Sequence, residues 1–276
     1  MGGLTGQTVL VTGAASGMGH CLALEFARQG CDLVLVDINP DGLERTAGEV
    51  RGLGSAAECH TVDITDSEQV GALASGVSPG VLVNCAGLGF TADLEHTTMA
   101  DWHLLFDVNM FGTINMVQAF LPGMKAAGTG RIMNIASGFG LVSFPSMGAY
   151  CASKHAVVAY TEALAAEVKR YGIRVTLVCP GITRTPFLDA TDMKGYDDTS
   201  RRREFLQRVL PLVSTTPDSL ARFAVKALRR DRRMVVHTWV AKLAYYSNRV
   251  SRLVTGAFLD LVYRVVTRMR PAQPGP

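Results

Sequence analysis

The chain has 276 residues, of which 48% are hydrophobic and 18% are charged. This composition is that of an ordinary globular protein rather than a disordered one, and the length fits one large α/β domain with a short appendage. The net charge of +3 hides an asymmetry, because residues 1–200 hold 11 Lys and Arg against 20 Asp and Glu, whereas residues 201–276 hold 16 against 4. We therefore expect the last quarter of the chain to form a separate, basic segment.

The cysteines and histidines favour no metal site. The six cysteines include no C-x-x-C pair and the six histidines include no i,i+4 pair. We therefore expect reduced, buried cysteines in a cytoplasmic protein and no bound metal. No basic segment precedes an apolar run at the N-terminus, and no stretch of about 18 uncharged apolar residues occurs, so we expect neither a signal peptide nor a spanning helix.

Short β-branched runs alternate with longer amphipathic ones through most of the chain. The near-continuous hydrophobicity of the short runs is typical of parallel strands that are covered on both faces. We expect strands at 8–11, 33–36, 81–84, 131–135 and 174–179, one more strand closed by Asp63, and helices at about 18–29, 40–53, 67–76, 101–127 and 149–171. The alternation predicts an α/β fold with a doubly wound, Rossmann-like parallel sheet, which binds ligands at the carboxyl ends of its strands.

A glycine-rich turn, TGAASGMG, joins the first expected strand to the first helix. A pyrophosphate reaches the bare N–H groups of a helix N-terminus most closely where no Cβ intervenes. This context predicts a dinucleotide site whose residues here are Gly13, Ser16, Gly17, Met18 and Gly19.

Other strand ends complete the expected cofactor site. Asp37, at the end of the second strand, can bind the adenosine ribose hydroxyls and repel a 2′-phosphate. No Arg or Lys lies in the glycine turn and Ile38 follows Asp37, so the sequence favours NAD over NADP. The remaining expected contacts are Asp63, Ile64, Asn84, Ala86 and Gly87 on the adenine half, and Pro180, Gly181, Ile182 and Thr185 around the nicotinamide.

Tyr150 and Lys154 lie four residues apart in an expected helix, so their side chains share one face. A nearby ammonium favours the phenolate, and a pKa lowered by about two units would let Tyr150 act as a base on an alcohol or as an acid on a carbonyl. The pair alone is also compatible with an ordinary amphipathic helix. Ser137, whose hydroxyl can hold a substrate oxygen, and Asn109, in the long helical stretch, strengthen the catalytic interpretation.

These motifs together resemble the short-chain dehydrogenase/reductase family over roughly residues 5–236. The matching segments are TGAASGMG at 12–19, Asp37, VDI at 62–64, NCAG at 84–87, Asn109, Ser137, YCASK at 150–154 and PGITRT at 180–185. The resemblance implies that Tyr150 is the acid/base, that Lys154 lowers its pKa, and that both contact the cofactor. It also implies that Ser137 orients the substrate and that Asn109 supports a proton-relaying water. In addition, it implies a homodimer or homotetramer whose subunits pair through the helices near 101–127 and 149–171. Cys85 stands where the family often has a second Asn, a change that is compatible with the turn.

The alternating pattern stops between Thr185 and Pro217. We expect a helical lid at about 186–216, within a dehydrogenase domain that spans 1–236. This segment and the 138–148 loop offer apolar side chains and no convincing anion-binding cluster, which favours a hydrophobic secondary alcohol or ketone as substrate. The expected substrate contacts are Ser137, Phe139, Phe144, Tyr150 and Phe187.

Residues 237–276 are expected to form a basic amphipathic helical extension that is broken or bent near Gly256. Two uses of this extension stay open: packing on the body or on a second subunit, and lying on the inner face of an anionic membrane. No aromatic-interleaved module is evident, so nucleic acid is not an expected partner.

The sequence therefore predicts an NAD-dependent oxidoreductase that acts on the CH–OH group of a hydrophobic alcohol. Two alternatives stay open: an NADPH-dependent carbonyl reductase of a biosynthetic pathway, and a non-catalytic scaffold or sensor that binds NAD. The intact set of Ser137, Tyr150 and Lys154 argues against the second alternative.

Overall fold

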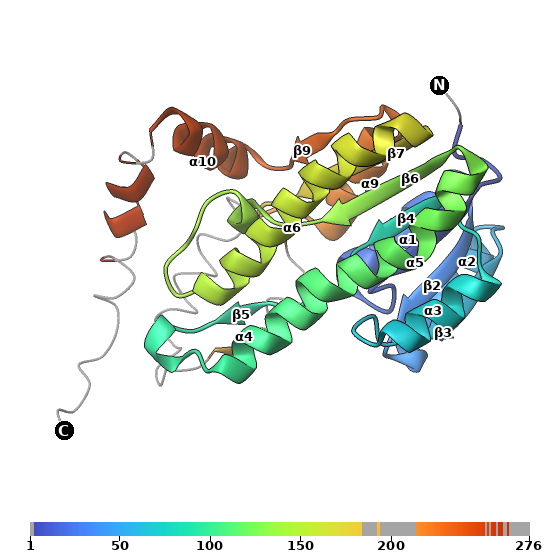
Figure 1. The fold of residues 1–276 in the computed structure, drawn as a ribbon, viewed down its shortest axis with the longest axis horizontal. Coiled ribbons are helices and arrows are strands. Elements are labelled where there is room, and N and C mark those ends of the chain that lie inside the picture. Colours follow the sequence, from blue (N-terminus) through green and yellow to red (C-terminus); the bar gives the residue numbers. More distant parts are fainter. Residues whose placement is uncertain are drawn as a thin grey trace.

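A single parallel sheet of seven strands organises the protein (Figure 1). The computed structural model describes residues 3–183, 192–193, 214–251, 253, 255–257, 259–261 and 264. In sheet order the strands are β3 (Ala57–Thr61), β2 (Asp32–Asp37), β1 (Thr8–Thr12), β4 (Val81–Asn84), β6 (Gly130–Ile135), β7 (Ile173–Cys179) and β9 (Met234–Val236). The order reverses direction between β1 and β4, so the expected doubly wound, Rossmann-like fold is confirmed, and a ligand crevice is expected at the carboxyl ends of these two strands.

Helices cover both faces of the sheet. One face carries α1 (Gly17–Arg28), α2 (Pro40–Gly52) and α9 (Pro217–Arg229), and the other carries α3 (Ser67–Gly76), α5 (Gly112–Ala127) and α6 (Gly148–Val168). In strand β1, near the centre of the sheet, the middle residues are continuously apolar because both faces of the strand are buried. Val9 and Val11 point into the core beneath α1, α2 and α9, while Leu10 points into the opposite core. Alternate side chains of a strand face opposite ways, so a strand buried on both faces needs every position apolar.

The expected helix at 101–127 is interrupted by a wider turn. Thr98 and Asp101 form a capping box that begins α4 (Met99–Phe106), and a π-helical turn, η2 (Asp107–Phe111), joins α4 to α5. Together these elements make one helical stretch, Met99–Ala127, that is long and apolar enough to cross a membrane by length and composition. Its buried side chains, such as Met116 and Phe120, pack into the core of the sheet. Core packing explains part of its apolar composition, whereas Leu104 and Phe111 in the same stretch are more than half exposed.

Shorter elements complete the described chain. They are β5 (Phe90–Thr91), β8 (Asp192–Met193) and the 3-10 turns η1 (Leu94–His96), η3 (Gly138–Gly140) and η4 (Lys169–Tyr171). The lid expected at 186–216 lies mostly outside the described residues. Its described residues are 192–193 and 214–216. Asp192–Met193 form β8, which pairs with β5 as a short parallel strand rather than as a helix, and Thr215 forms a parallel bridge to Thr183.

The C-terminal extension begins with α10 (Trp239–Val250). The break or bend expected near Gly256 lies at Ser251 instead, because α10 ends at Val250 and Ser251 adopts an extended backbone with φ −155° and ψ 111°. The Ser251 carbonyl accepts a hydrogen bond of 3.2 Å from the Thr255 N–H, so a new helical segment begins here. Serine is a preferred residue at a helix start, whereas Gly256 lies within the following helical turn.

Candidate active site

The glycine turn between β1 and α1 packs against the end of β4. Gly13 has a φ of +69°, and a Cβ there would lie 2.8 Å from the Ala86 Cα. A Cβ on Gly19 would overlap the Gly13 carbonyl. Both positions therefore require glycine, and the bare turn is left at the N-terminus of α1.

The first residues of α1 keep hydrogen-bonding groups available. Ser16 is the N-cap residue, yet its hydroxyl makes no capping hydrogen bond. The N–H groups of Gly17 and Met18 belong to the first helical turn, where no carbonyl of the same helix can accept them. An anion at this terminus would meet these donors and the positive end of the helix dipole.

Asp37 holds the same turn from the end of β2. Its Oδ2 accepts a hydrogen bond of 3.1 Å from the Ala15 N–H, and its Oδ1 accepts one of 3.0 Å from the Asn39 N–H. The carboxylate is only partly buried. It therefore stands at the expected ribose position and also fixes the backbone around it.

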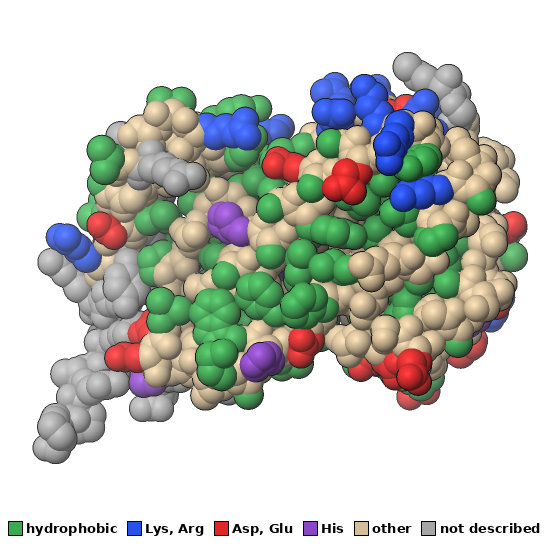
Figure 2. All heavy atoms as spheres, in the orientation of Figure 1, with side chains coloured by type: hydrophobic (Ala, Val, Ile, Leu, Met, Phe, Trp, Pro, Cys, Tyr) green, Lys and Arg blue, Asp and Glu red, His purple; other side chains and the backbone are tan. Residues whose placement is uncertain are grey.

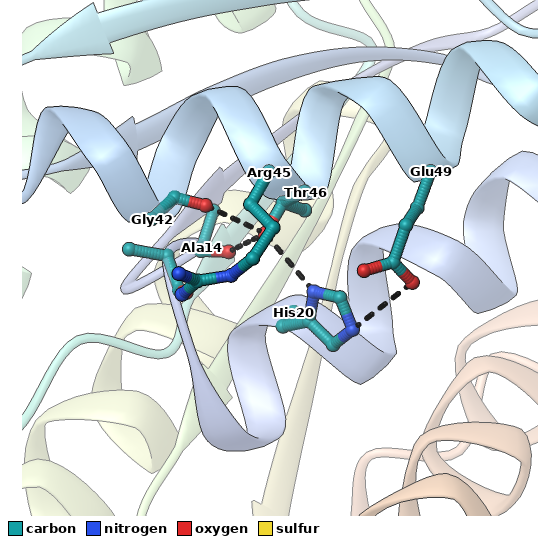
Figure 3. Close-up of polar contacts among 7 residues, drawn as sticks. Ala14, His20, Gly42, Arg45, Thr46 and Glu49 are labelled. Carbon is teal, nitrogen blue, oxygen red and sulfur yellow. Dashed lines mark hydrogen bonds and ion pairs between the residues drawn. The ribbon is translucent and has the colours of Figure 1, made fainter.

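Helix α2 packs against the outside of the glycine turn, and it makes polar contacts there through side chains that were not among the expected site residues (Figure 3). The Thr46 hydroxyl donates to the Ala14 carbonyl at 2.9 Å and lies 2.9 Å from His20 Nδ1. His20 Nε2 in turn lies 3.5 Å from a Glu49 carboxylate oxygen. The spacing of His20, Thr46 and Glu49 in the sequence matches no known motif. Their proximity therefore becomes visible only in the folded structure.

Arg45 reaches the turn from the same helix. Its Nη2 lies 3.5 Å from the carbonyl oxygen of Ala15, and the N–H of the same Ala15 is bound by Asp37. A guanidinium and a carboxylate thus flank one residue of the turn. The glycine turn itself contains no Arg or Lys, as the sequence shows, but the fold brings Arg45 of α2 beside it.

Two further strand ends carry expected cofactor contacts: the end of β4 lies beside this turn, and the end of β3 lies beyond β2 in the sheet. Asp63 Oδ1 accepts hydrogen bonds from both the N–H and the hydroxyl of Thr65, and Ile64 is buried against the start of α5. The Thr12 hydroxyl, which opens the glycine-rich motif but was not among the expected contacts, accepts from the Cys85 and Ala86 N–H groups at 3.0 and 3.1 Å. This bond ties the β4 end to β1.

Asn84 belongs to a buried polar chain beneath the site. Its Nδ2 donates to Asn134 Oδ1 at 2.8 Å, and Asn134 Nδ2 donates to the Thr161 hydroxyl at 2.9 Å. All three side chains are buried. The amide of Asn84 therefore links β4, β6 and α6, and its position inside the protein argues for a structural role rather than direct cofactor contact.

Ser137 and Tyr150 meet at the carboxyl end of β6. Ser137 follows the strand in extended conformation, and its Oγ accepts a hydrogen bond of 3.1 Å from the Phe139 N–H. Tyr150 lies in the first turn of α6 and its side chain is hydrogen-bonded to that of Ser137. Burial raises the pKa of Tyr150 to about 12, although the bond to Ser137 opposes the rise.

Lys154 lies one turn along α6 and is also buried. Its Nζ donates to the Ile135 carbonyl at 3.3 Å, and a Cβ on Gly87 would lie 3.1 Å from the same nitrogen. Burial lowers the pKa of Lys154 to about 8, against the opposing effect of the Cys85 and Cys179 thiols. The expected lowering of the Tyr150 pKa is thus wrong for this structure, because desolvation disfavours the charged form of both groups.

Asn109 lies in the π-helical turn and holds the loop after β4. Its Oδ1 accepts from the Leu88 N–H at 2.8 Å, and its Nδ2 donates to the Leu88 carbonyl and the Ser153 hydroxyl at 3.1 Å each. A Cβ on Gly87 would lie 2.8 Å from Asn109 Oδ1. Gly87 therefore passes between Asn109 and Lys154, and the three residues form one cluster.

An aromatic wall stands beside Tyr150. The Phe139 ring centroid lies 6.5 Å from that of Tyr150 in an edge-on arrangement and 5.5 Å from that of Phe144. The two phenylalanines that were expected to contact substrate are thus on the Tyr150 side of the site. Phe187, the third, and Thr185 lie outside the described residues.

The loop after β7 closes the other side. The Pro180 carbonyl accepts from the Gly138 N–H at 2.7 Å, and the Ile182 carbonyl accepts from the Thr215 N–H at 3.0 Å. A Cβ on Gly181 would run into the Thr238 side chain. Thr238 begins the C-terminal extension, so this extension abuts the expected nicotinamide loop, a contact that no sequence motif signalled.

Comparison with known proteins agrees with this geometry. A family model described as short chain dehydrogenase matches residues 7–194. The chain is 31% identical to the putative oxidoreductase SadH of Mycobacterium tuberculosis over 98% of this chain and 99% of that protein. It is 37% identical to estradiol 17-beta-dehydrogenase 11 of Homo sapiens over 67% of this chain and 64% of that enzyme.

Solved structures show the same architecture. A short chain dehydrogenase/reductase from Burkholderia phymatum in complex with NAD matches with a TM-score of 0.79 and 28% identity, covering 100% of this chain and 99% of that chain. An alcohol dehydrogenase from Thermococcus sibiricus complexed with 5-hydroxy-NADP, at 24% identity and a TM-score of 0.72, covers 85% of this chain and 97% of that chain and shares the fold. The protein therefore belongs to the short-chain dehydrogenase/reductase family of oxidoreductases.

Proposed function

We propose that the protein transfers a hydride between NAD and a hydrophobic secondary alcohol or ketone, with Tyr150 as the general acid/base. The observation that carries this proposal is the hydrogen-bonded pair of Ser137 and Tyr150, with Lys154 one helical turn away. This set stands at the same sheet edge as the glycine turn. Proton-transfer groups and a dinucleotide site therefore face one crevice.

The residues at this edge fit a dinucleotide. Gly13 and Gly19 leave the turn bare, the Ser16 hydroxyl has no capping role, and the Asp37 carboxylate stands at the end of β2. When bound, NAD supplies the nicotinamide ring that accepts the hydride from the alcohol carbon. The chain's own contribution is to hold the pyrophosphate on the α1 N-terminus and the ribose at Asp37.

The proton is handled at the Tyr150 hydroxyl. With a pKa of about 12, this hydroxyl is protonated at neutral pH and can donate to a carbonyl oxygen. In the oxidising direction it must lose its proton, and a charged Lys154 favours that loss. With a pKa of about 8, Lys154 is roughly nine-tenths protonated at pH 7. Ser137 orients the substrate oxygen toward Tyr150.

The surroundings of Tyr150 favour an apolar substrate. Phe90, Leu105 and Ala149 are buried around it, and Phe139 and Trp102 pack against that group. A charged substrate would lose its hydration here without gaining a partner from these side chains. Hydrophobic secondary alcohols and their ketones fit this environment.

Arg45 favours a second candidate, an NADPH-dependent carbonyl reductase. A guanidinium beside Ala15 can pair with a phosphate, whereas Asp37 at the same residue repels one. Steady-state rates with both cofactors decide between them. We expect a preference for NAD, and Arg45→Ala should weaken the use of NADP more than that of NAD. A wild-type preference for NADP would overturn the NAD assignment.

We also propose a homo-oligomer through the helices at about 101–127 and 149–171, which are α4, η2, α5 and α6 with η4. Leu104 and Phe111 are more than half exposed on these helices, and both are large and apolar. Light scattering of the purified protein should give a dimer or tetramer. Leu104→Glu with Phe111→Glu should give a monomer, and an unchanged mass for this variant would remove these residues from the interface.

A panel of secondary alcohols, followed by NADH absorbance, tests the proposed reaction. Steroids, terpenols and short polar alcohols should rank by apolar character. Tyr150→Phe should lower turnover by about 10²- to 10⁴-fold while NAD still raises the thermal midpoint of the variant. Tyr160→Phe, farther along α6, is the matched control and should retain activity. Full activity of Tyr150→Phe would refute the mechanism, and NAD binding without turnover of any alcohol or ketone would favour a scaffold or sensor.

A further inference from the structure

Helix α10 carries an apolar stripe on its solvent face. Trp239, Leu243, Tyr246 and Val250 follow one another at spacings of three or four residues, and their exposed fractions are 65%, 62%, 63% and 87%. Such spacing places all four on one side of a helix. Large side chains of this kind are usually buried, so a continuous exposed row needs an explanation.

The opposite side of α10 is attached to the body of the protein. Asn248 Nδ2 donates to the Leu141 carbonyl at 3.1 Å, and a Cβ on Gly138 would lie 3.4 Å from the Ala241 Cβ. The Thr238 hydroxyl accepts from the Ala241 N–H at 3.3 Å and begins the helix next to Gly181. These contacts fix the rotation of α10, so the stripe points outward because the helix is docked by its other face.

The other exposed positions of α10 are basic. They are Lys242 and Arg249, and the helix contains no acidic residue. Figure 2 shows Lys and Arg side chains beside hydrophobic ones along the edge of the molecule that α10 occupies. Farther along the extension, Leu253 is 86% exposed and Leu261 is 59% exposed. The exposed face therefore combines large apolar, aromatic and cationic side chains.

We propose that this face of α10 binds the surface of an anionic lipid membrane. Aromatic and aliphatic side chains insert at the boundary between headgroups and acyl chains, and neighbouring Lys and Arg pair with anionic headgroups. A second copy of α10 fits less well, because it would present the same Lys242 and Arg249 with no carboxylate on either helix to pair with them. The proposal is independent of the reaction that the protein catalyses.

Docking by α10 would bring the substrate side of the protein to the membrane. The helix contacts the loops that follow Ser137 and Pro180, at Gly138 and Gly181 respectively. Apolar alcohols partition into lipid, so an enzyme held in this way would meet its substrate at the surface where it concentrates.

Flotation of the full-length protein with lipid vesicles tests the proposal. Wild type should float with vesicles of phosphatidylcholine mixed with phosphatidylglycerol, less with phosphatidylcholine alone, and less in high salt. Lys242→Gln with Arg249→Gln should weaken binding to the anionic vesicles by about 25-fold, at about fivefold for each charge. Trp239→Ser with Leu243→Ser and Tyr246→Ser should weaken binding to both kinds of vesicle by at least about tenfold. Leu53→Ser, at an exposed apolar residue after α2, is the matched control and should bind as wild type.

Circular dichroism and light scattering accompany each variant, because they separate membrane binding from folding and from assembly. The substituted side chains are exposed, so each variant should retain the wild-type spectrum. Equal flotation of wild type and the triple serine variant would overturn the proposal, as would failure of wild type to bind anionic vesicles. A triple variant that loses oligomer mass but keeps its flotation would instead assign the stripe to contact between copies.

Discussion

Replacing Lys154 by methionine should remove a buried charge that the folded protein carries at a cost. The side chain is buried in the first half of α6, and burial lowers its pKa from 10.5 to about 8. Below pH 8 the ammonium is charged in both the folded and the unfolded protein, so folding bears the full desolvation cost. Between pH 8 and 10.5 the folded protein has released this proton while the unfolded chain still holds it, so the stability of wild type rises with pH.

The size of this effect follows from the shift. One pKa unit corresponds to about 1.4 kcal/mol, so the lowered pKa of Lys154 amounts to about 3 kcal/mol of free energy of unfolding, of which about 2 to 3 kcal/mol is recovered between pH 7 and pH 10. Methionine at this position cannot titrate. It also loses the hydrogen bond to the Ile135 carbonyl, but that loss is the same at every pH and cancels from the comparison.

Urea unfolding of wild type and Lys154→Met at several pH values between 7 and 10 measures the difference. Wild type should gain about 2 to 3 kcal/mol relative to the variant across this range. Lys125→Met, at an exposed lysine of α5, is the matched control, and its difference from wild type should stay constant. A constant difference for Lys154→Met, within about 0.5 kcal/mol, would refute the desolvation of Lys154.

Two further substitutions test the contacts that hold the glycine turn and the strand ends of the site in place. Gly19→Ala places a Cβ against the Gly13 carbonyl, so it should abolish the thermal shift produced by NAD, whereas Gly48→Ala, where a Cβ meets nothing within 4 Å, should retain it. Asn134→Ala leaves the Asn84 amide without its acceptor in a buried chain, so urea unfolding should show a loss of about 2 to 4 kcal/mol. Gln118→Ala, on the exposed face of α5, should change the free energy of unfolding by less than about 0.5 kcal/mol.

The sequence predicted the sheet well because its strands are buried on both faces. Each of the five expected strands with stated bounds lies within one residue of β1, β2, β4, β6 or β7. Two elements near the C-terminus were missed, α9 and β9. Helix α9 carried a usable signal, since Thr216 precedes Pro217 and its hydroxyl accepts from the Ser219 N–H. Strand β9 has only three residues, too few to show a period.

The candidate site likewise contains some residues that the sequence predicts and others that it does not. Positions within a motif, such as Tyr150 and Lys154, are predicted because helical spacing fixes their relation. Arg45 and Thr238 are not, because their relation to the glycine turn and to Gly181 exists only once α2 and α10 have packed. The directions of the pKa shifts of Tyr150 and Lys154 could not be predicted from the sequence either. Spacing brings an ammonium near a phenol, but burial determines that the pKa of Tyr150 rises.

Three side chains of the candidate site also form hydrogen bonds that hold the neighbouring backbone. Asp37 binds the Ala15 N–H, Asn109 binds both backbone groups of Leu88, and Lys154 binds the Ile135 carbonyl.

Lost activity at Asp37, Asn109 or Lys154 therefore has two sources, the missing chemical group and a displaced loop, which cofactor affinity and unfolding free energy must separate. Tyr150→Phe differs from these substitutions, because phenylalanine keeps the ring that packs edge-on against Phe139 and removes only the hydroxyl. Its effect on turnover, at unchanged NAD affinity, therefore measures proton transfer most directly.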